Sequence, residues 1–403
     1  MRILFLAPQP FFQERGTTIA IDLLLKALAQ RDDTVDVLTF HLGEDRDYPR
    51  IRLYRAAPPF APAEVKPGFS WNKVYCDLFL FRDAFRMVRR NRYDLIYAVE
   101  EAGFMAMILG RYASVPYVFD MDSSMAEQLA ERYRWIRPVE PILQWLETLP
   151  MRGALSVVPM CEHLAQIARR HCAGSVHVLK DVSLLGSRSS GEVEDLRRSL
   201  QIRGPMLMYV GNLKTYQGID LMLESVAKLP ARYSHARLVV IGGNDASLEK
   251  YRGKAKELGV AEQVHFVGPR PVDALGDYLT QADLLLSPRI TGTNTPMKIY
   301  SYLDSGVAVV ATALLTHTQV MTDEHAALTA PEPDAMADAI VRLLDDPEQR
   351  MRLAARARAL VKREHSREAF RRSAHAAFSE IERRVAANGL RKRVSAEPEP
   401  TEP

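Results

Sequence analysis

The chain has 403 residues, 47% hydrophobic and 26% charged, so it is long enough for two domains with buried cores and too apolar for a disordered protein. Its 53 Lys and Arg against 50 Asp and Glu give a formal net charge of +3, which argues against nucleic acid as a partner. Cys76, Cys161 and Cys172 have no C-x-x-C spacing, so we expect free thiols in a reducing compartment and no cysteine-bound metal.

The N-terminal apolar run, Ile3–Ala7, is too short for the core of a signal peptide and is followed by Pro8 and Pro10. We interpret it as a buried first strand. No segment of the sequence approaches the roughly 18 consecutive apolar residues that a membrane span requires. These features predict a cytoplasmic protein.

Short apolar runs alternate with longer stretches of helical period along the chain, which is typical of βαβ units around a parallel sheet. The predicted fold class is therefore α/β. In the first half we expect strands at Arg2–Ala7, Thr34–Phe40, Asp94–Val99, Pro116–Asp120, Ala154–Pro159 and Val176–Leu179. A second series follows Gly204, with strands at Met206–Val210, Arg237–Gly242, Gln263–Gly268, Asp283–Ser287 and Val307–Thr312.

The Ser- and Gly-rich stretch Asp181–Gly191 separates the two series and predicts a hinge between domains. We expect an N-terminal domain over residues 1–182 and a C-terminal domain over residues 183–388, with the last helix packing back on the first domain. Residues 389–403 lack hydrophobic periodicity and predict a disordered tail. Parallel sheets bind ligands outside the carboxyl ends of their strands, so we expect the ligand in a cleft between the two domains.

The stretch Trp71–Arg92 predicts a basic amphipathic helix, because several aromatic and aliphatic residues share it with five arginines. Two interpretations remain open. A domain helix with a solvated basic face has this pattern, and so does a helix that rests on an anionic membrane. The second interpretation places the protein peripherally at the inner face of the membrane.

Polar residues follow the strands of the first half. Gly16 and Thr17 come after the first strand and open a helix, which suits close approach of a sugar or phosphate and is equally explained by a simple helix start.

Carboxylates follow the next two central strands of the first half. Glu100 and Glu101 follow one strand, and Asp120 and Asp122 follow the other, so four carboxylates that suit sugar hydroxyls meet at one edge of the sheet. Capping of the helix expected at Ser123–Arg132 is the alternative role for one of the two aspartates.

In the second half, Gly211 and Gly218 lie between a strand and a helix. Gly211 permits close approach of the backbone to a phosphate, and the helix beginning near Gly218 directs free N–H groups at the same place. A tight turn that needs glycine for packing is the alternative interpretation.

A later segment, Ser287–Gly306, predicts an anion pocket. Thr295 as N-cap and Pro296 as first helical residue predict a helix start after a small polar loop. Lys298 then falls in the first turn, where the helix dipole disfavours a cation unless an anion is nearby. We predict a pyrophosphate partner, the alternative being a solvated lysine on a helix face.

These motifs resemble the retaining glycosyltransferases of family 4, also called glycosyl transferases group 1, which have the GT-B fold. The resemblance covers nearly the whole chain and is most specific at Tyr209–Leu223 and Thr293–Thr312. It implies two Rossmann-like domains with parallel sheets facing a central cleft, the acceptor on the first domain and a nucleotide-diphosphate sugar on the second.

The sequence departs from the family at its charged motif positions. In the family, an arginine and a lysine contact the donor phosphates; here these positions are Asn212 and Gln217. The family also has two glutamates eight positions apart, and here these positions are Thr293 and Ser301. The family also tends to carry a histidine near Asp122 that contacts the transferred sugar, and this sequence has the aspartate instead. We expect cationic side chains nearby to supply charge to the phosphate site instead, namely Lys214, Arg289 and Lys298.

The predicted catalytic residues are Lys298 and Asp122. The predicted donor-binding residues are Gly16, Thr17, Gly211, Asn212, Lys214, Gln217, Arg289, Thr293, Asn294, Thr295 and Ser301, and the acceptor-side candidates are Glu100, Glu101 and Asp120. The resemblance implies no obligatory cofactor and no metal. We therefore do not interpret Asp120-Met-Asp122 as a metal-binding D-x-D motif.

The resemblance implies transfer of a sugar from a nucleotide-diphosphate sugar to a hydroxyl of a saccharide or lipid-linked acceptor with retention of anomeric configuration. Retention would proceed by front-face attack, in which the leaving phosphate takes the acceptor proton. The replaced charges leave a catalytically silent nucleotide-sugar binding or scaffold protein of glycan biosynthesis as the alternative. A nucleotide-sugar 2-epimerase is a weaker alternative, because we find no matching acid–base pair.

Overall fold

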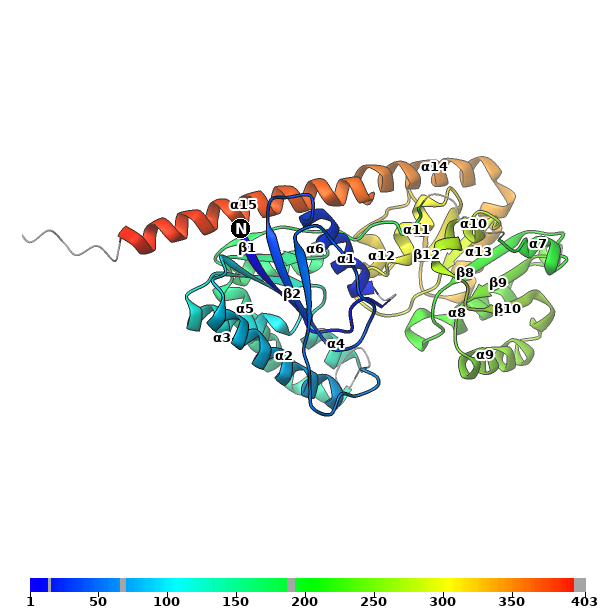
Figure 1. The fold of residues 1–403 in the computed structure, drawn as a ribbon. Helices are drawn as coiled ribbons and strands as arrows, with labels where there is room; N and C mark the ends of the chain where they lie inside the picture. Colours follow the sequence, from blue (N-terminus) through cyan, green and yellow to red (C-terminus); the bar gives the residue numbers. More distant parts are fainter. Residues whose placement is uncertain (14–15, 66–69, 133, 187–192, 395–403) are drawn as a thin grey trace, which may run out of the picture. The chain divides into compact units, whose positions relative to one another are not determined.

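The computed structural model describes residues 1–13, 16–65, 70–132, 134–186 and 193–394. The chain divides into two compact units. Unit 1 comprises Met1–Lys180 and Phe370–Pro403, and unit 2 comprises Asp181–Ala369. Figure 1 labels their helices and strands and colours them from the N-terminus (blue) to the C-terminus (red).

Unit 1 is built on a seven-stranded parallel sheet in the order β3-β2-β1-β4-β5-β6-β7. Its strands are β1 (Arg2–Ala7), β2 (Thr34–Thr39), β3 (Ile51–Arg55), β4 (Leu95–Val99), β5 (Tyr117–Met121), β6 (Ser156–Pro159) and β7 (Ser175–Val176). The prediction missed β3, because this edge strand alternates partly buried with exposed residues and has no apolar run. The strand predicted at Val176–Leu179 is instead the short β7.

Helices cover both faces of this sheet. They are α1 (Gly16–Leu28), α2 (Trp71–Arg90), α3 (Ala102–Ala113), α4 (Met125–Arg132), α5 (Glu140–Gly153), α6 (Glu162–His171) and α15 (Arg367–Val394), with a 3-10 helix η1 (Arg134–Val139). Leu80 of α2 and Leu109 of α3 pack with Leu4 and Ile96 in one core. On the other face, Phe378 of α15 stacks on Tyr97 at a centroid distance of 5.5 Å.

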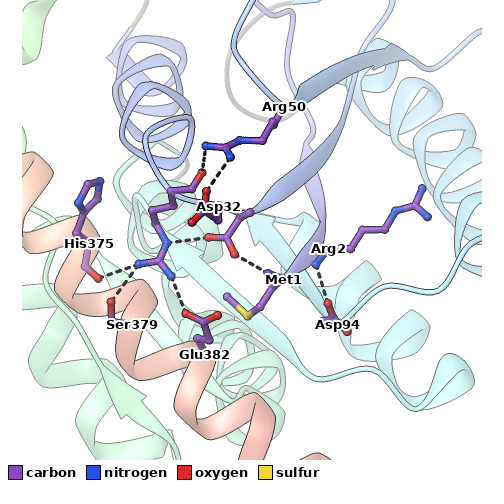
Figure 2. Close-up of polar contacts among 10 residues, drawn as sticks. Met1, Arg2, Asp32, Arg50, Asp94, His375, Ser379 and Glu382 are labelled. Carbon is purple, nitrogen blue, oxygen red and sulfur yellow. Dashed lines mark hydrogen bonds and ion pairs between the residues drawn. The ribbon is translucent and has the colours of Figure 1, made fainter.

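The last helix is fastened to unit 1 by polar contacts as well. Arg31 donates to the carbonyl of His375 (3.4 Å), to Ser379 Oγ (3.0 Å) and to Glu382 Oε2 (2.9 Å), and Figure 2 shows these three partners on one side of α15. Arg31 Nε also donates to Asp33 Oδ2 at 2.7 Å. Because α15 continues to Val394, the tail predicted from residue 389 begins too early; residues 395–403 lie outside the described residues.

Unit 2 is built on a six-stranded parallel sheet in the order β10-β9-β8-β11-β12-β13. Its strands are β8 (Met206–Val210), β9 (Arg237–Ile241), β10 (Val264–Gly268), β11 (Leu284–Ser287), β12 (Ala308–Thr312) and β13 (Ala327–Thr329). The prediction placed the first five of these within one residue and missed β13, whose three residues are too few to show a pattern.

Unit 2 buries both faces of its sheet, as the continuous apolar strands require. Its helices are α7 (Leu196–Ser199), α8 (Ile219–Ala227), α9 (Asp245–Glu257), α10 (Leu275–Leu279), α11 (Lys298–Asp304), α12 (Leu315–Thr318), α13 (Pro333–Asp345) and α14 (Pro347–Glu364). Leu207 and Tyr209 of β8 enter the core under α8, α9 and α13. Met206 and Met208 enter the core under α10, α11 and α14. The α/β class with two Rossmann-like parallel sheets is therefore confirmed.

Across the described residues, the structure contains no helix that combines the length and the apolar character needed to cross a bilayer.

Candidate functional site

The strand order reverses once in each sheet, between β1 and β4 in unit 1 and between β8 and β11 in unit 2. Open parallel sheets bind ligands at such switch points, outside the carboxyl ends of the strands. The predicted residues follow these strands. Gly16 comes after β1, Glu100 after β4, Gly211 after β8 and Arg289 after β11.

Lys298 joins the two motifs of unit 2. Its Nζ lies 3.1 Å from Gln217 Oε1 and 3.9 Å from the centre of the Tyr209 ring. Burial, together with the positive charge of Arg289, lowers the pKa of Lys298 well below its ordinary value. The amide oxygen and the ring face only partly compensate the buried ammonium, so an anion placed here would stabilise the charged form.

Gly211 brings its backbone up to this lysine. Its φ is +147°, and a Cβ at this position would lie 3.2 Å from Lys298 Nζ and 3.1 Å from the Tyr209 hydroxyl. Gly218 is required for a different reason. Its φ is +72°, and a Cβ there would lie 1.8 Å from the carbonyl oxygen of Pro288. Gly211 therefore keeps the space beside the ammonium open, whereas Gly218 lets the two motif loops touch.

Arg289 belongs to the loop after β11. Its Nε donates to the Thr291 carbonyl at 2.7 Å, and its guanidinium lies 5.2 Å from the centre of the Tyr216 ring. Ile290 N donates to the Tyr216 carbonyl at 3.1 Å. The loop that carries the arginine is thus held against η2 (Thr215–Gln217).

The helix start predicted at Thr295 and Pro296 is wrong. α11 begins at Lys298, and its N-cap residue, Met297, has no capping side-chain hydrogen bond. Thr295 does not cap because its Oγ1 is buried and accepts from Gln319 Nε2 at 3.0 Å. The same Nε2 donates to the Thr293 carbonyl at 2.8 Å.

Four further predicted donor residues have distinct surroundings. The Asn294 carbonyl accepts from Thr316 Oγ1 at 2.6 Å. Asn212 Oδ1 accepts from the Lys214 backbone amide at 3.3 Å, and the Lys214 side chain is exposed. Ser301 is fully buried, and its Oγ accepts from the Leu184 amide at 3.1 Å. Ser301 therefore fastens the start of unit 2 to α11, a role that the motif position did not suggest.

His317 is a residue of this region that the sequence analysis missed. It is fully buried, its Nδ1 donates to the Thr312 carbonyl at 2.7 Å, and its Nε2 accepts from Ser287 Oγ at 2.9 Å. Thr312 Oγ1 in turn donates to the Arg289 carbonyl at 2.6 Å. Burial lowers the pKa of His317 to about 4, so a neutral ring joins the ends of β11 and β12. Its only sequence signal is its place five residues after a predicted strand.

In unit 1, Gly16 is exposed and begins α1, and Thr17 is partly buried beside it. The neighbouring Thr18 donates its hydroxyl to the Gln13 carbonyl. Thr18 thus connects the start of α1 to the preceding loop. Thr17 remains a predicted ligand contact.

The predicted carboxylates of unit 1 surround a lysine that the sequence analysis did not single out. Lys73 of α2 forms an ion pair with Glu101 and lies 4.0 Å from Glu100 Oε2. Burial, reinforced by the charge of Glu101, raises the pKa of Glu100 to about 7 and that of Asp77 to about 8. Three carboxyl groups around one ammonium cannot all ionise cheaply in a buried site, so the cluster holds protons near neutral pH.

Asp120 and Asp122 come shortly before α4 in the chain. Asp120 Oδ2 accepts from the Tyr97 hydroxyl at 2.8 Å. The helix start is capped by Ser124, whose Oγ accepts from the Glu127 amide, and by Glu147, whose carboxylate accepts from the Met125 amide at 2.7 Å. Asp122 is partly buried beside this start. Both aspartates remain predicted ligand contacts.

Among the His, Cys, Asp and Glu side chains of the described ranges, no group of three is arranged so that it could hold a metal ion.

Two family models match the chain. The glycosyl transferase 4-like domain matches residues 15–179, and glycosyl transferases group 1 matches residues 192–360. Similar curated proteins carry related names. Alpha-D-kanosaminyltransferase of Streptomyces kanamyceticus is 23% identical over 63% of this chain and 67% of its own length. D-inositol 3-phosphate glycosyltransferase of Corynebacterium glutamicum is 29% identical over 43% of each chain, so the match spans less than half of that relative.

Solved structures show the same fold over nearly the whole chain. Sucrose-phosphate synthase from Thermosynechococcus elongatus is 20% identical, with a TM-score of 0.73 over 94% of this chain and 98% of that one. Anabaena HepE in complex with UDP-glucose is 17% identical, with a TM-score of 0.70 over 94% of this chain and 100% of that one. The predicted GT-B type of two Rossmann-like domains is therefore confirmed.

Proposed function

Because the chain belongs to the group 1 glycosyltransferases, we propose that it moves a hexose from a nucleotide-diphosphate sugar to a hydroxyl of a saccharide or lipid-linked acceptor, with retention of anomeric configuration. The enzyme class follows from the family. The donor, the acceptor and retention are our proposal. Since HepE binds UDP-glucose in a similar fold, UDP-glucose is the first donor to test.

The observation that carries the proposal is the desolvated ammonium of Lys298 beside Gly211. A diphosphate oxygen at this place would pair with Lys298 and approach the Gly211 backbone, where a side chain would collide. Arg289 adds a second positive charge nearby, which is visible in its effect on the pKa of Lys298. These groups supply the charge that Asn212 and Gln217 do not carry.

The same charge would act on the reaction. When the bond between the anomeric carbon and the diphosphate oxygen breaks, negative charge grows on the leaving diphosphate. A preorganised cation at that position stabilises the transition state more than the ground state. The acceptor oxygen forms the new bond to the anomeric carbon, and its proton passes to the leaving phosphate.

On unit 1, we propose that Glu100, Glu101, Asp120 and Asp122 bind sugar hydroxyls of the acceptor or of the transferred sugar. Carboxylates accept hydrogen bonds from hydroxyls in well-defined directions. Glu100, which is partly protonated near neutral pH, can also donate one. For a lipid-linked acceptor, we propose that the basic helix α2 brings unit 1 to a membrane.

A silent nucleotide-sugar binding protein is the second candidate. It is favoured by Ser301, which stands at a motif glutamate position and is buried against the Leu184 amide. Such a protein would keep Lys298 and Gly211 for binding and transfer nothing.

The deciding experiment measures UDP-glucose binding by calorimetry and then glucose transfer to mixed saccharide and lipid-extract acceptors by nuclear magnetic resonance. Binding with an α-linked product supports retention. Binding without transfer or UDP release supports the silent protein, and a β-linked product contradicts retention. Lys298→Met should weaken binding strongly, whereas Lys256→Met, which removes the same charge from an exposed position of α9, should preserve most of it. GDP- and ADP-sugars follow if UDP-glucose does not bind.

A further inference from the structure

The three tryptophans of the chain are all exposed and all belong to unit 1. Trp71 is 78% exposed, Trp135 77% and Trp145 53%. Tryptophan is normally among the more buried side chains, because its large ring removes much apolar surface from water. Exposure of every tryptophan in a chain with two extensive cores therefore indicates an interaction surface.

The surface begins with a stripe along α2. Trp71, Leu78, Arg82 and Arg89 are spaced by seven, four and seven residues, which places them on one side of a helix. Leu78 is 64% exposed. The loop residue Phe60 is exposed as well. It lies beside α2, because its amide donates to the Tyr75 hydroxyl of that helix at 3.2 Å.

The neighbouring helices continue the apolar surface. α3 packs against both α2 and α5 in the layer that covers one face of the sheet, and Figure 1 shows the three helices in succession. Ile108 and Tyr112 are exposed on α3, and the Tyr112 ring lies 4.8 Å from Phe85 of α2. Ile142 and Trp145 are exposed on α5, one helical turn apart.

Positive charge accompanies these apolar side chains. The helices α2, α3 and α5 together contain seven Lys and Arg residues against four Asp and Glu. Glu147 is buried, and Asp83 is paired with Arg82 (2.9 Å) and Arg86 (3.2 Å), which weakens the acidic contribution further. Arg86, Arg89 and Arg90 are exposed at the C-terminal end of α2.

We propose that this surface, the α2–α3–α5 face, docks unit 1 on an anionic lipid bilayer. It comprises Phe60, Trp71, Leu78, Ile108, Tyr112, Ile142 and Trp145 with Arg86, Arg89, Arg90 and Arg111. Tryptophan prefers the boundary between acyl chains and headgroups, and arginines beside it pair with anionic headgroups. An acidic protein partner would satisfy the arginines but would not account for aromatic side chains spread over three helices. The proposal extends the membrane contact of α2 to three helices and depends on neither the donor nor the reaction.

The tryptophans make the first test direct, because no buried tryptophan contributes to the emission of the protein. The full chain is titrated with vesicles of phosphatidylglycerol and phosphatidylcholine (1:1) and with vesicles of phosphatidylcholine alone. We expect a blue shift of tryptophan emission and co-sedimentation with the anionic vesicles, with at least tenfold weaker partitioning to the neutral ones.

Variants then identify the face. Trp71→Ser/Leu78→Ser/Trp145→Ser and, separately, Arg86→Gln/Arg89→Gln/Arg90→Gln should each reduce co-sedimentation at least tenfold. Arg352→Gln/Arg356→Gln/Arg358→Gln on α14 removes the same charge from exposed positions of unit 2 and should leave binding within twofold. Circular dichroism checks that each variant is folded. If the apolar variant unfolds, the arginine variant, which removes no buried side chain, serves as the test.

Three results would overturn the proposal. One is no binding of the wild-type chain to anionic vesicles. Another is equal loss of binding in the α14 control, which would mean general charge attraction. The third is a blue shift without lipid that rises with protein concentration and coincides with dimers in sedimentation velocity, which would assign the face to a second copy of the chain.

Discussion

The two sheets place titratable groups of different type, mainly carboxyl groups in unit 1 and cationic side chains in unit 2, at the same topological position. At the carboxyl edge of the unit 1 sheet, Glu100, Glu101 and Asp77 surround Lys73. At the corresponding edge of unit 2, Lys298 lies with Arg289 near the neutral His317. Both edges arise from parallel strands whose order reverses at the sheet centre. The shared fold supplies the location of a site, and the loop residues decide what chemistry it suits.

The direction of each pKa shift sharpens this difference. Burial raises the pKa of Glu100 and Asp77 and lowers that of Lys298 and His317. All four groups are thus pushed toward their neutral forms. The unit 1 edge suits neutral hydroxyls, whereas the unit 2 edge gains its charge when an anion arrives.

The largest effect is expected from removal of the unit 2 charge. Lys298→Met should lower kcat/KM by about 100-fold to 1,000-fold, the usual range for loss of a preorganised group that stabilises transition-state charge. The unliganded variant should melt at a higher temperature than wild type, because methionine removes a desolvated ammonium without leaving a large cavity. Steady-state kinetics and a thermal melt check both parts. Unchanged kinetics would assign the charge of the site to other residues.

Backbone geometry gives the next largest effect. Gly218→Ala should destabilise unit 2 by about 3 kcal/mol, because its Cβ would overlap the Pro288 carbonyl at positive φ. The control is Gly253→Ala within α9, where a Cβ meets nothing within 4 Å. That change should stabilise the helix by about 0.5–1 kcal/mol. Urea denaturation measures both, and equal outcomes would contradict the steric argument.

His317 predicts a loss of stability on acidification. Its pKa is about 4 in the folded chain against an ordinary 6.5, so the unfolded chain binds more protons between these values. Its contribution is therefore complete above pH 6.5 and falls as the pH drops, by about 2 kcal/mol at pH 5. The difference in unfolding free energy between pH 7 and pH 5 should shrink by this amount in His317→Gln. An unchanged difference would show that His317 is not the titrating group.

The carboxylate cluster predicts the opposite dependence and the smallest effect. Asp77 has a pKa of about 8 in the folded chain against an ordinary 3.8, so the folded chain binds more protons and loses stability as the pH rises through this window. Asp77→Asn should therefore stabilise unit 1 by about 1 kcal/mol more at pH 8.5 than at pH 7. Asp83→Asn, on the same helix but paired with Arg82 and Arg86, is the control and should show no such rise. A rise in both variants would point to the net charge of the helix.

The pattern of apolar runs in the sequence predicted most of the strands. Eleven strands were predicted from it, including β1 and β8 with the observed bounds. The two missed strands, β3 and β13, lie at sheet edges. Burial of both faces makes a central strand uniformly apolar, whereas an edge strand or a three-residue strand carries no such pattern.

The sequence by itself determined the α/β class, the two series of strands, the glycines after β8 and the lysine near the start of α11, because local spacing and residue type encode them. Only the tertiary structure decided which side chains meet. Lys73 and Glu101 are 28 positions apart in the chain, and Lys298 and Gln217 are 81 apart. His317, Gln319 and the exposed tryptophans likewise acquire their roles from neighbours that lie far away in the sequence. Burial and contact depend on how the helices pack on the sheets, and the sequence pattern along one element does not contain that information.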